Sequence, residues 1–522
     1  MRYLILIATL FLTHCAYAQS PKELQPLLEI AGADSNGRLG EVARGVGDIN
    51  KDGLADVSVS EPGVYKTYVY YGGSPMSNKP AVTLEGGGMI ASGDFNGDGW
   101  IDLAIEKYGQ DSVLLYYGGL LMDTIPAVFL YSPNKIHHYG FRLAAGDING
   151  DGFDDLVVAE NDVNSLDSSI FIRGELYVYA GGISFDSIPR LTIWGDTLRA
   201  GLGWDLTIGN VNADGMKDIL ALGYNQLSYI GQNQFFYLSV FVGDSLFQLR
   251  RNYYIDSRRV PGSFKEHVSS FDADSGGVDD ILVNKIYVFK GGVQLDTLPT
   301  YYVSPPYNDT VTYGPYPWIG GGGDYNRDGV KDIVLRSDYG VFGTAPGFFV
   351  MLGKRGSPGH FQGYRVFAQC CGFAIYGNPE NAGDVNGDGV EDIIIGDPTE
   401  AYPTHKGFFG IYSGDSSLVV SVNEKDLQRP ESFRLEQNFP NPFNPQTTIE
   451  YTLPQRQLVK IKIYDSLGRE VTTLVNQFQD IGTHRIQWDG SDVSGRKVSS
   501  GVYYYQLQTP NFHDTKKLIN LK

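Results

Sequence analysis

Cysteine is nearly absent from this chain. Only three of the 522 residues are cysteine, and one of them, Cys15, lies in an apolar N-terminal segment. The other two, Cys370 and Cys371, are neighbours, so the chain is not a scaffold held together by disulfides. Two interpretations of this pair stay open: two separate thiols, or a strained disulfide between adjacent residues.

Positive charge is also scarce. The chain has 41 Lys and Arg against 60 Asp and Glu, which gives a net charge of −19 at pH 7. Nucleic-acid binding depends on clustered Lys and Arg, so this balance argues against nucleic acid as a partner. The single adjacent histidine pair, His137-His138, is interpreted as part of an exposed loop. We find no nucleophile elbow and no Cys-His constellation, so we predict no catalytic residues from sequence motifs.

Long apolar runs are missing too. No stretch reaches the 18 or more residues of a membrane-spanning helix, so we expect no transmembrane segment in the mature chain. The short apolar run Leu4–Leu12 follows Arg2 and precedes a small-x-small site at residues 16–18. This pattern predicts that residues 1–18 are a secretory signal peptide. His14 stands where a lipoprotein signal needs a small residue, which disfavours Cys15 as a lipid attachment site.

Glycine and tyrosine are abundant, with 65 and 35 residues, and much of the glycine belongs to a repeat. One acidic segment recurs seven times, and the first Asp of the first and last copies are Asp48 and Asp384. The 336 residues between them make six intervals of 56 residues on average, which suits a four-stranded unit with generous loops. The copies are GDINKDGLADVSV, GDFNGDGWIDLAI, GDINGDGFDDLVV, GNVNADGMKDILA, FDADSGGVDDILV, GDYNRDGVKDIVL and GDVNGDGVEDIII, starting at residues 47, 93, 146, 209, 271, 323 and 383.

Each repeat has the pattern of β-structure. An entry strand precedes the acidic segment, an apolar strand follows it, and later strands end in Gly, as in YVYYGG at 68–73. The segment Leu27–Ile30 looks like an outer strand without a unit of its own, whereas the seventh unit lacks one unless residues 418–422 provide it. We therefore predict an all-β chain in which residues 19–422 form a seven-bladed β-propeller. In this ring the N-terminal strand completes the last blade and removes the exposed edges.

The acidic segments have the composition of calcium loops. Counted from the first acidic position, oxygen-bearing side chains stand at positions 1, 3, 5 and 9, and Gly stands at position 6. Several oxygen ligands, mostly carboxylates, suit a hard cation such as Ca²⁺. The predicted ligands are Asp48, Asn50, Asp52, Asp56, Asp94, Asn96, Asp98, Asp102, Asp147, Asn149, Asp151, Asp155, Asn210, Asn212, Asp214, Asp218, Asp324, Asn326, Asp328, Asp332, Asp384, Asn386, Asp388 and Asp392.

We expect the seven copies to differ in their affinity for Ca²⁺. The fourth has Asn210 and Asn212 in place of carboxylates, so we expect it to bind more weakly. The fifth, which begins at Asp272, has Gly276 at position 5, and we expect it to be empty or very weak. The prediction is therefore five or six Ca²⁺ ions. An EF-hand loop also opens with D-x-N-x-D-G, but it needs an acid at position 12, where this chain has only Val, Ile, Ala or Leu.

These segments resemble the FG-GAP repeats of integrin α-subunit propellers, over about 400 residues of the chain. The repeats do not contain the exact FG-GAP motif: Tyr139-Gly140-Phe141 only approximates it, and most units have a single Gly. The resemblance implies structural calcium loops on one face of the ring and ligand contacts on the other. On that arrangement the ligand face would include residues 161–173, 224–234, 338–346 and 398–406, and the loops near His137, Arg258-Arg259, Tyr307–Tyr316 and Cys370-Cys371.

The C-terminal part has a different character. Residues 423–432 are polar and are interpreted as a linker, and residues 433–522 alternate strands with Asp-Gly and Ser-Gly turns, which predicts a small immunoglobulin-like β-sandwich. The segments PNPFNP, IYDSLGREV, WDGSDVSG and SGVYYY resemble the type A sorting domain of the type IX secretion system. That resemblance implies export through the outer membrane of a Bacteroidetes-type bacterium. A generic immunoglobulin-like module is the alternative.

Two functions fit these observations. The favoured one is a secreted or surface-displayed binding or adhesion module for a protein or glycan ligand, with the type IX machinery as a second partner. The alternative is a secreted glycosidase or lyase whose active site lies in the propeller channel, because scattered loop residues leave no linear motif. A hydrolase or lyase should bring carboxylates or a Tyr, Lys or His set together in the channel, away from the acidic segments.

Overall fold

The computed structural model describes residues 22–133, 138–161, 173–196, 201–226, 234–259, 267–283, 287–295, 299–302, 320, 322–337, 347–353, 362–367, 379–399, 404–418, 433–453, 457–479, 482–509 and 512–521. The chain divides into two compact units, Met1–Val420 and Ser421–Lys522. Regular structure in these ranges is almost all strand, apart from two 3-10 turns, η1 (Pro62–Val64) and η2 (Ser257–Arg259). Within the same ranges no helix has the length and apolarity needed to cross a membrane.

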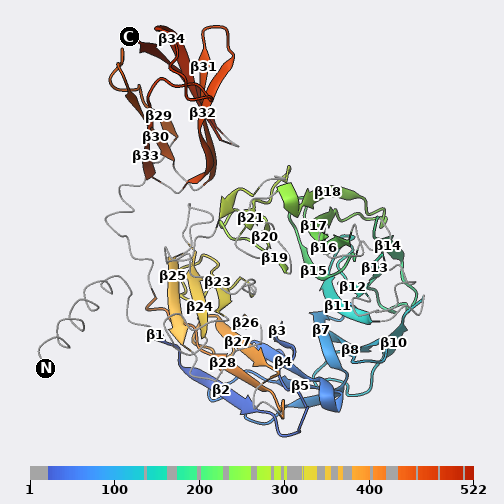
Figure 1. The fold of residues 1–522 in the computed structure, drawn as a ribbon. Helices are drawn as coiled ribbons and strands as arrows, with labels where there is room; N and C mark the ends of the chain where they lie inside the picture. Colours follow the sequence, from blue (N-terminus) through green and yellow to red (C-terminus); the bar gives the residue numbers. More distant parts are fainter. Residues whose placement is uncertain are drawn as a thin grey trace, which may run out of the picture. The chain divides into compact units, whose positions relative to one another are not determined.

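The first unit is a seven-bladed β-propeller, as predicted, and each blade contains a four-stranded sheet (Figure 1). Blades 1 to 4 are built from β3 (Ala43–Gly47), β4 (Asp56–Glu61), β5 (Lys66–Tyr70) and β6 (Val82–Glu85); β7 (Gly87–Gly93), β8 (Asp102–Lys107), β9 (Ser112–Tyr116) and β10 (Val128–Tyr131); β11 (Tyr139–Gly146), β12 (Asp155–Glu160), β13 (Glu175–Tyr179) and β14 (Leu191–Trp194); and β15 (Asp205–Gly209), β16 (Asp218–Gln226), β17 (Gln234–Phe241) and β18 (Arg251–Asp256).

The last three blades include two strands from the N-terminus. Blade 5 has β19 (Val268–Phe271), β20 (Asp280–Val283), β21 (Tyr287–Phe289) and β22 (Tyr301–Tyr302); blade 6 has β23 (Ile333–Ser337), β24 (Gly347–Leu352), β25 (Gln362–Phe367) and β1 (Lys22–Glu23); and blade 7 has β26 (Pro379–Gly383), β27 (Asp392–Asp397), β28 (Phe408–Tyr412) and β2 (Pro26–Ala31). In blade 6 the described part of the first strand pairs with the second through one isolated antiparallel bridge, between Gly323 and Asp332.

The second strand of a blade has neighbours on both faces, which explains its apolar sequence. Every residue of β4, β12 and β27 is buried, whereas the outer strands β6 and β10 alternate between exposed and buried positions. The apolar side chains pack between neighbouring blades. One cluster joins Leu115 of blade 2 to Leu156 of blade 3, and another joins Val178 of blade 3 to Ile219 of blade 4. The core is therefore a series of layers between blades.

The N-terminal strand closes the ring. Strand β2 is antiparallel to β28, with Leu28 opposite Ile411 and Ile30 opposite Phe409. The prediction that Leu27–Ile30 completes the last blade is confirmed by this register. The preceding strand, β1, was not expected: it runs parallel to β25, with Lys22 opposite Val366, so the N-terminal segment also extends blade 6.

The second unit is an immunoglobulin-like β-sandwich made of two sheets. Its core packs Trp488 against Phe443 and Tyr503, with ring centroids 5.4 and 5.6 Å apart. One sheet has the order β29-β30-β33 and the other β32-β31-β34-β35, with β29 (Arg434–Leu435), β30 (Thr447–Leu453), β31 (Gln457–Asp465), β32 (Glu470–Gln479), β33 (Gly482–Trp488), β34 (Gly501–Gln508) and β35 (His513–Asn520). The predicted signal peptide and linker lie outside the described residues.

Candidate metal centres in the acidic loops

Each acidic segment connects the first and second strands of its blade. We call these segments the acidic loops and number them by blade: Asp48–Asp56, Asp94–Asp102, Asp147–Asp155, Asn210–Asp218, Asp272–Asp280, Asp324–Asp332 and Asp384–Asp392. In six loops the residue at position 9 is the first residue of the second strand, for example Asp155 in β12. Because every first strand runs toward its loop, all seven loops lie at one end of the ring.

The carboxylate at position 9 ties each loop to its own blade. In loop 3, Asp155 Oδ2 accepts the Ile148 N–H at 2.9 Å, and Oδ1 accepts the Gly181 N–H at 2.9 Å. The same two bonds recur in the other six loops, at 2.7–3.2 Å. Position 9 therefore joins the loop to the glycine that follows the third strand.

That glycine is required by a close approach of backbone. A Cβ on Gly181 would lie 2.4 Å from the Asp154 carbonyl oxygen, and one on Gly291 would lie 2.1 Å from that of Asp279. No side chain fits there, since real Cβ atoms essentially never come within 3.0 Å of such an atom. The sequence already contains the Gly-ended third strands, but their bond to position 9 becomes visible only in the fold.

Positions 1, 3 and 5 hold one another in place. In loop 3, Asp147 accepts the N–H groups of Gly150 and Gly152 at 2.7 and 2.9 Å. The Asn149 Nδ2 donates to Asp151 Oδ2 at 2.8 Å, and Asp151 Oδ1 accepts the Phe153 N–H at 3.0 Å. A carboxylate oxygen has further lone pairs beyond those used here, so these bonds orient the oxygens and still leave capacity for a cation.

Position 6 is glycine for conformational reasons. Its φ is positive in all seven loops, between +80° and +93°, a region that L side chains rarely adopt. Space is not the constraint, because a Cβ built on Gly53 or Gly152 meets nothing within 4 Å. The left-handed residue turns the chain sharply enough for positions 1, 3 and 5 to share one small loop.

The buried carboxylates at position 9 carry an electrostatic cost. Burial raises their pKa although each accepts two backbone N–H bonds. The pKa is raised to about 6 for Asp56, Asp218 and Asp280, to about 7 for Asp102, Asp155 and Asp392, and to about 8 for Asp332. The nearby acids of the same loop add to the increase. A cation held by positions 1, 3, 5 and 9 would compensate this charge, so the donor set fits Ca²⁺.

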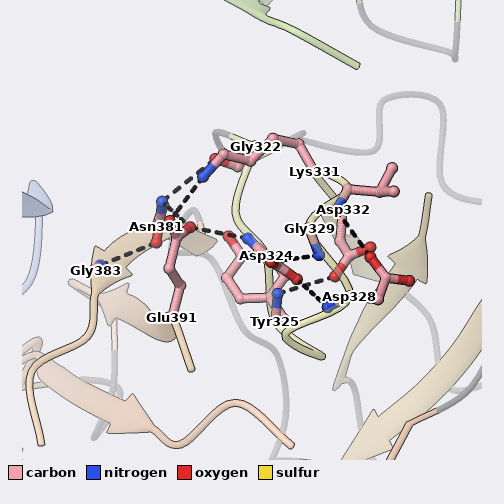
Figure 2. A network of polar contacts seen from close by, with 11 residues as sticks. Gly322, Asp324, Tyr325, Asp328, Gly329, Lys331, Asp332, Asn381, Gly383 and Glu391 are labelled. Atoms are coloured by element: carbon pink, nitrogen blue, oxygen red, sulfur yellow. Dashed lines mark hydrogen bonds and ion pairs between the residues drawn. The ribbon is translucent and has the colours of Figure 1, made fainter. Parts of the chain in front are cut away.

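Neighbouring loops are also joined to each other. Figure 2 shows loop 6 beside blade 7, where Glu391 Oε2 accepts the Asp324 N–H at 2.9 Å and Glu391 Oε1 pairs with Lys331 at 2.7 Å. Asn381 Nδ2 donates to the same Glu391 carboxylate at 2.9 Å. Residues at position 8 make equivalent bonds elsewhere: Asp154 accepts from Asp94 N and Asp279 from Asn210 N, both at 2.9 Å. The loops of neighbouring blades are therefore connected by direct polar contacts.

Loop 5 is ion-paired to a lysine outside it, at a position where no other blade has a lysine. Oxygens of Asp272, Asp274 and Asp280 all lie within 4.8 Å of one another, although position 5 is Gly276. The Lys290 ammonium forms an ion pair with Asp274. Lys290 directly precedes the third-strand glycine of blade 5, where the other blades have Tyr, Ala, Val, Leu or Ser. We infer that this ammonium supplies part of the positive charge that a metal would supply in the other loops.

This inference about loop 5 predicts a change in metal stoichiometry. The double variant Gly276→Asp, Lys290→Met restores the position 5 carboxylate and removes the competing ammonium, so the chain should bind one more Ca²⁺ than the wild type. Metal counting after exhaustive dialysis measures it. The matched control is Lys217→Met, which removes a lysine 3.5 Å from Asp279 without altering a predicted ligand set. An unchanged count in the double variant would contradict the inference.

A second polar constellation, at the other end of the ring, was missed in the sequence. Arg142 Nε donates to Asp205 Oδ1 at 3.0 Å, and Asp205 Oδ2 lies 2.7 Å from His267 Nδ1. The three residues stand at one equivalent position, four residues before the residue that precedes the acidic loop, in blades 3, 4 and 5. Burial acts to raise the pKa of Asp205. The charges of His267 and Arg142 outweigh this effect and lower the pKa to about 2. Aligning the repeats one strand earlier could have revealed this set.

Aromatic rings surround this constellation. The Arg142 guanidinium lies 4.5 Å from the Phe141 ring centroid, and Phe141 is 6.0 Å from Trp204. Trp204 in turn contacts Tyr224 and Phe236, with centroids 5.5 and 6.2 Å apart. Phe141, Trp204 and Tyr224 are only partly buried. We call Phe141, Arg142, Trp204, Asp205, Tyr224 and His267 the channel-end cluster.

Most of the predicted ligand face lies outside the described residues, namely residues 162–172, 227–233, 338–346, 400–403, His137, Tyr307–Tyr316 and Cys370-Cys371. Arg258 is described: it pairs with Asp256 at 2.6 Å, and its guanidinium lies 3.6 Å from the Phe235 ring centroid. Its charge is therefore already engaged by its own blade.

Comparisons with known proteins agree with the two-unit organisation. The family model described as FG-GAP-like repeat matches residues 48–105 and 94–158, and the FlgD Ig-like domain matches residues 444–511. No curated protein matches the chain.

Three solved structures are similar to this chain at low sequence identity. PorZ, a surface component of the type IX secretion system of Porphyromonas gingivalis, is 12% identical, with 90% of this chain and 74% of that chain covered and a TM-score of 0.29. A glycoside hydrolase family 43 arabinoxylan arabinofuranohydrolase from Bacillus subtilis is 11% identical, with coverage of 75% and 97% and a TM-score of 0.26. A β-fructofuranosidase from Aspergillus kawachii is 9% identical, with coverage of 94% and 92% and a TM-score of 0.32. At these scores the likeness assigns no functional residue.

Proposed function

We propose that this chain is a secreted or cell-surface binding module, a calcium-stabilised β-propeller that holds a protein or glycan ligand at the end of the ring opposite the acidic loops. The observation that carries the proposal is the channel-end cluster. It places partly exposed aromatic rings beside an arginine, an aspartate and a histidine, at the ends of strands whose other ends lead into the loops. Aromatic and arginine side chains are enriched where proteins hold ligands.

The export route is part of the same proposal. The predicted signal peptide would take the chain to the periplasm, and residues 433–522 would direct it through type IX machinery to the surface of a Gram-negative, Bacteroidetes-type cell. The immunoglobulin-like fold of the second unit and the sorting-domain segments in its sequence support this. A chain that lacks residues 433–522 should accumulate in the periplasm of such a cell, measured by fractionation; its appearance outside the cell would contradict the route.

An enzyme is the second candidate, and two observations favour it. Asp205 forms an ion pair with His267 at the channel end. Burial raises the pKa of Glu106 to about 7, although the charge of Arg142 acts to lower it. A carboxylic acid that titrates near neutral pH can act as a general acid in glycan cleavage. The structural explanation competes with it, because Asp205 also accepts the Val268 N–H at 2.9 Å and so ties three blades together.

One assay separates the two candidates. The calcium-loaded chain from residue 19 onward is applied to a panel of glycans and bacterial surface proteins, and both retention and the release of new reducing ends are measured. We expect retention of at least one ligand without product. Product formation that disappears in His267→Gln would favour the enzyme, provided that the variant melts like the wild type. If the panel gives no retention and no product, both candidates are contradicted.

A further inference from the structure

Exposed aliphatic side chains gather at the acidic-loop end of the propeller. In the part of the propeller that the structure describes, every exposed Leu, Ile or Val lies in a turn between the third and fourth strands of a blade: Leu120, Leu121, Ile125, Ile183, Ile188, Leu246 and Val293. Because the third strand runs in the same direction as the first, these turns lie at the end that carries the acidic loops. Five of the seven, in blades 2 and 3, are 70–89% exposed, and we call these five the aliphatic rim: Leu120, Leu121, Ile125, Ile183 and Ile188.

The two turns that carry the aliphatic rim share one framework. Residues 119–126 (GLLMDTIP) and residues 182–189 (GISFDSIP) align without a gap. The fourth residue of each turn, Met122 or Phe185, is buried and anchors the turn in the core, whereas the aliphatic residues on either side of it stay exposed. Single exposed apolar residues are ordinary, but several together usually mark a binding surface.

Both turns are attached to acidic loop 2. The Gly118 N–H, at the start of the blade 2 turn, donates to Asp102 Oδ1 at 2.7 Å. The Gly182 N–H, in the blade 3 turn, donates to the Phe95 carbonyl at 2.9 Å, and the Phe95 and Phe185 rings are 5.9 Å apart. Because Phe95 and Asp102 belong to the same loop, the two turns are neighbours on one rigid support. The aliphatic rim is therefore a single surface.

The composition of the aliphatic rim favours a lipid surface over a protein partner. Residues 119–126 and 182–189 contain no Trp, Tyr, Lys or Arg. Protein interfaces concentrate their binding energy in Trp, Tyr and Arg, and Leu and Val are under-represented among those anchors. Leu and Ile, by contrast, partition favourably into the apolar part of a bilayer.

The charge of this end selects the kind of lipid. Acidic loops 2 and 3 and the two turns together contain nine Asp and no Lys or Arg. One Ca²⁺ in each loop would offset four of these charges, so the end stays negative and would repel anionic headgroups. Zwitterionic headgroups carry an ammonium that can face Asp123 and Asp186, which are exposed beside the aliphatic residues. The charges therefore fit a zwitterionic surface.

We propose that the aliphatic rim docks the propeller on a zwitterionic lipid surface, with its five side chains inserted at the boundary between headgroups and acyl chains. The inference goes beyond the proposed function, because it uses the end of the ring opposite the proposed ligand end. A propeller docked in this way has its acidic loops toward the bilayer and its channel-end cluster away from it, where an external ligand can reach the cluster.

The test is flotation of the calcium-loaded chain, from residue 19 onward, with vesicles of phosphatidylcholine. We expect the protein to float with the vesicles. The partition coefficient should fall at least tenfold in the double variant Leu120→Ser, Leu121→Ser, and it should also fall in Ile183→Ser, Ile188→Ser, because each variant removes two inserted side chains. The matched control is Tyr65→Ser, which removes a 49% exposed side chain from a turn between second and third strands, at the other end of the ring. Thermal melts verify that the variants fold.

The outcomes decide between a lipid and other occupants. No flotation, or equal flotation of the wild type and both double variants, would overturn the proposal. Replacing part of the phosphatidylcholine with phosphatidylglycerol should weaken binding at low ionic strength without excess Ca²⁺, and stronger binding would overturn the proposal. Self-association without flotation, lost in Leu120→Ser, Leu121→Ser, would overturn it and assign the surface to a second copy of the chain. The ligand panel is a separate readout: retention without flotation overturns only the lipid proposal, and flotation without retention or product overturns only the proposed function.

Discussion

Removal of calcium should lower the melting temperature of the propeller by about 15 °C or more. A ligand that binds only the folded state at 100 times its Kd adds about 2.7 kcal/mol per site, so six loops would add roughly 16 kcal/mol. An unfolding entropy of about 2.1 cal/mol/K per residue makes 1 kcal/mol worth roughly 1.2 °C in a unit of ~400 residues. The weaker fourth loop brings the expected value below the full sum.

The measurement is a thermal melt of the chain from residue 19 onward in EDTA and in Ca²⁺, paired with metal counting. The matched variant is Asp151→Asn, which can keep the bond from the Phe153 N–H but loses the bond from Asn149 Nδ2 and removes one charged ligand. It should lower the count by one with a small loss of stability. A count near zero with no effect of EDTA would mean that the hydrogen bonds alone hold the loops.

The stability of the folded propeller should depend on pH, and calcium should change that dependence. Without metal the position 9 carboxyls have pKa values raised to between about 6 and about 8 in the folded chain, whereas an unfolded Asp titrates near ~3.9. Between those values the folded state holds more protons than the unfolded state, so stability falls as the pH rises from about 4 to about 8. Bound Ca²⁺ keeps these groups ionised and should flatten the slope.

Other groups act in the same direction and must be separated. Burial raises the pKa of Glu106 and of Glu160 to about 7, and His267 contributes as well. The Asp205 carboxylate raises the pKa of His267 against the effect of burial, so its contribution is present at low pH and is lost as the pH rises through the raised value. Asp205 itself, with its pKa lowered to about 2, matters only below pH ~4. His267 pairs with Asp205 at the end of the ring opposite the loops, so its part of the slope should be equal with and without calcium. The difference between the two slopes therefore belongs to the loops.

The features that recur in every repeat could be predicted from the sequence, whereas contacts that occur only once between two blades could not. Seven copies of one spacing gave the blade count, and the unmatched segment Leu27–Ile30 gave the closing strand, because a ring leaves few alternatives for an orphan strand. Single contacts between blades could not be predicted. Lys290, the Arg142–Asp205–His267 set and the pairing of β1 with β25 each depend on which side chains meet across two separately folded sheets. Local patterns contain no information about that register.

The roles within the loops were also only partly visible. Spacing placed position 9 with the other predicted ligands, but its burial and its bonds to two backbone N–H groups make it part of the blade framework as well. In loop 3 the side chains at positions 1 and 5 accept hydrogen bonds from groups of that loop. Substitutions at position 9 should therefore damage folding, whereas those at position 5 should mainly weaken the metal.

Loss of the N-terminal strand should open the ring and cause association. Deleting residues 19–31 removes β1 with the buried Leu24, and it removes the five paired residues of β2 with the buried Leu28, which packs with Phe409 and Ile411. At about 1 kcal/mol per hydrogen bond and about 2 kcal/mol for the leucine, the loss is about 5 kcal/mol or more. The greater effect is the bare edge of β28, a strand of which every residue is buried in the closed ring. An unpaired apolar edge is a template for pairing with another chain.

Size-exclusion chromatography with thermal melts measures this outcome. The deleted chain should elute as oligomers, and a synthetic peptide of residues 20–32 should return it to the elution volume of the wild type by filling the edge. The point variant Leu28→Asp should behave similarly but more mildly, because a charge at a buried position disfavours docking of β2. Ala31→Asp is the matched control, since Ala31 is exposed at the end of the same strand. A deleted chain that stays at the wild-type elution volume and melts like the wild type would show that the ring does not depend on closure by β2, and that blades 7 and 1 hold together through their own apolar layer.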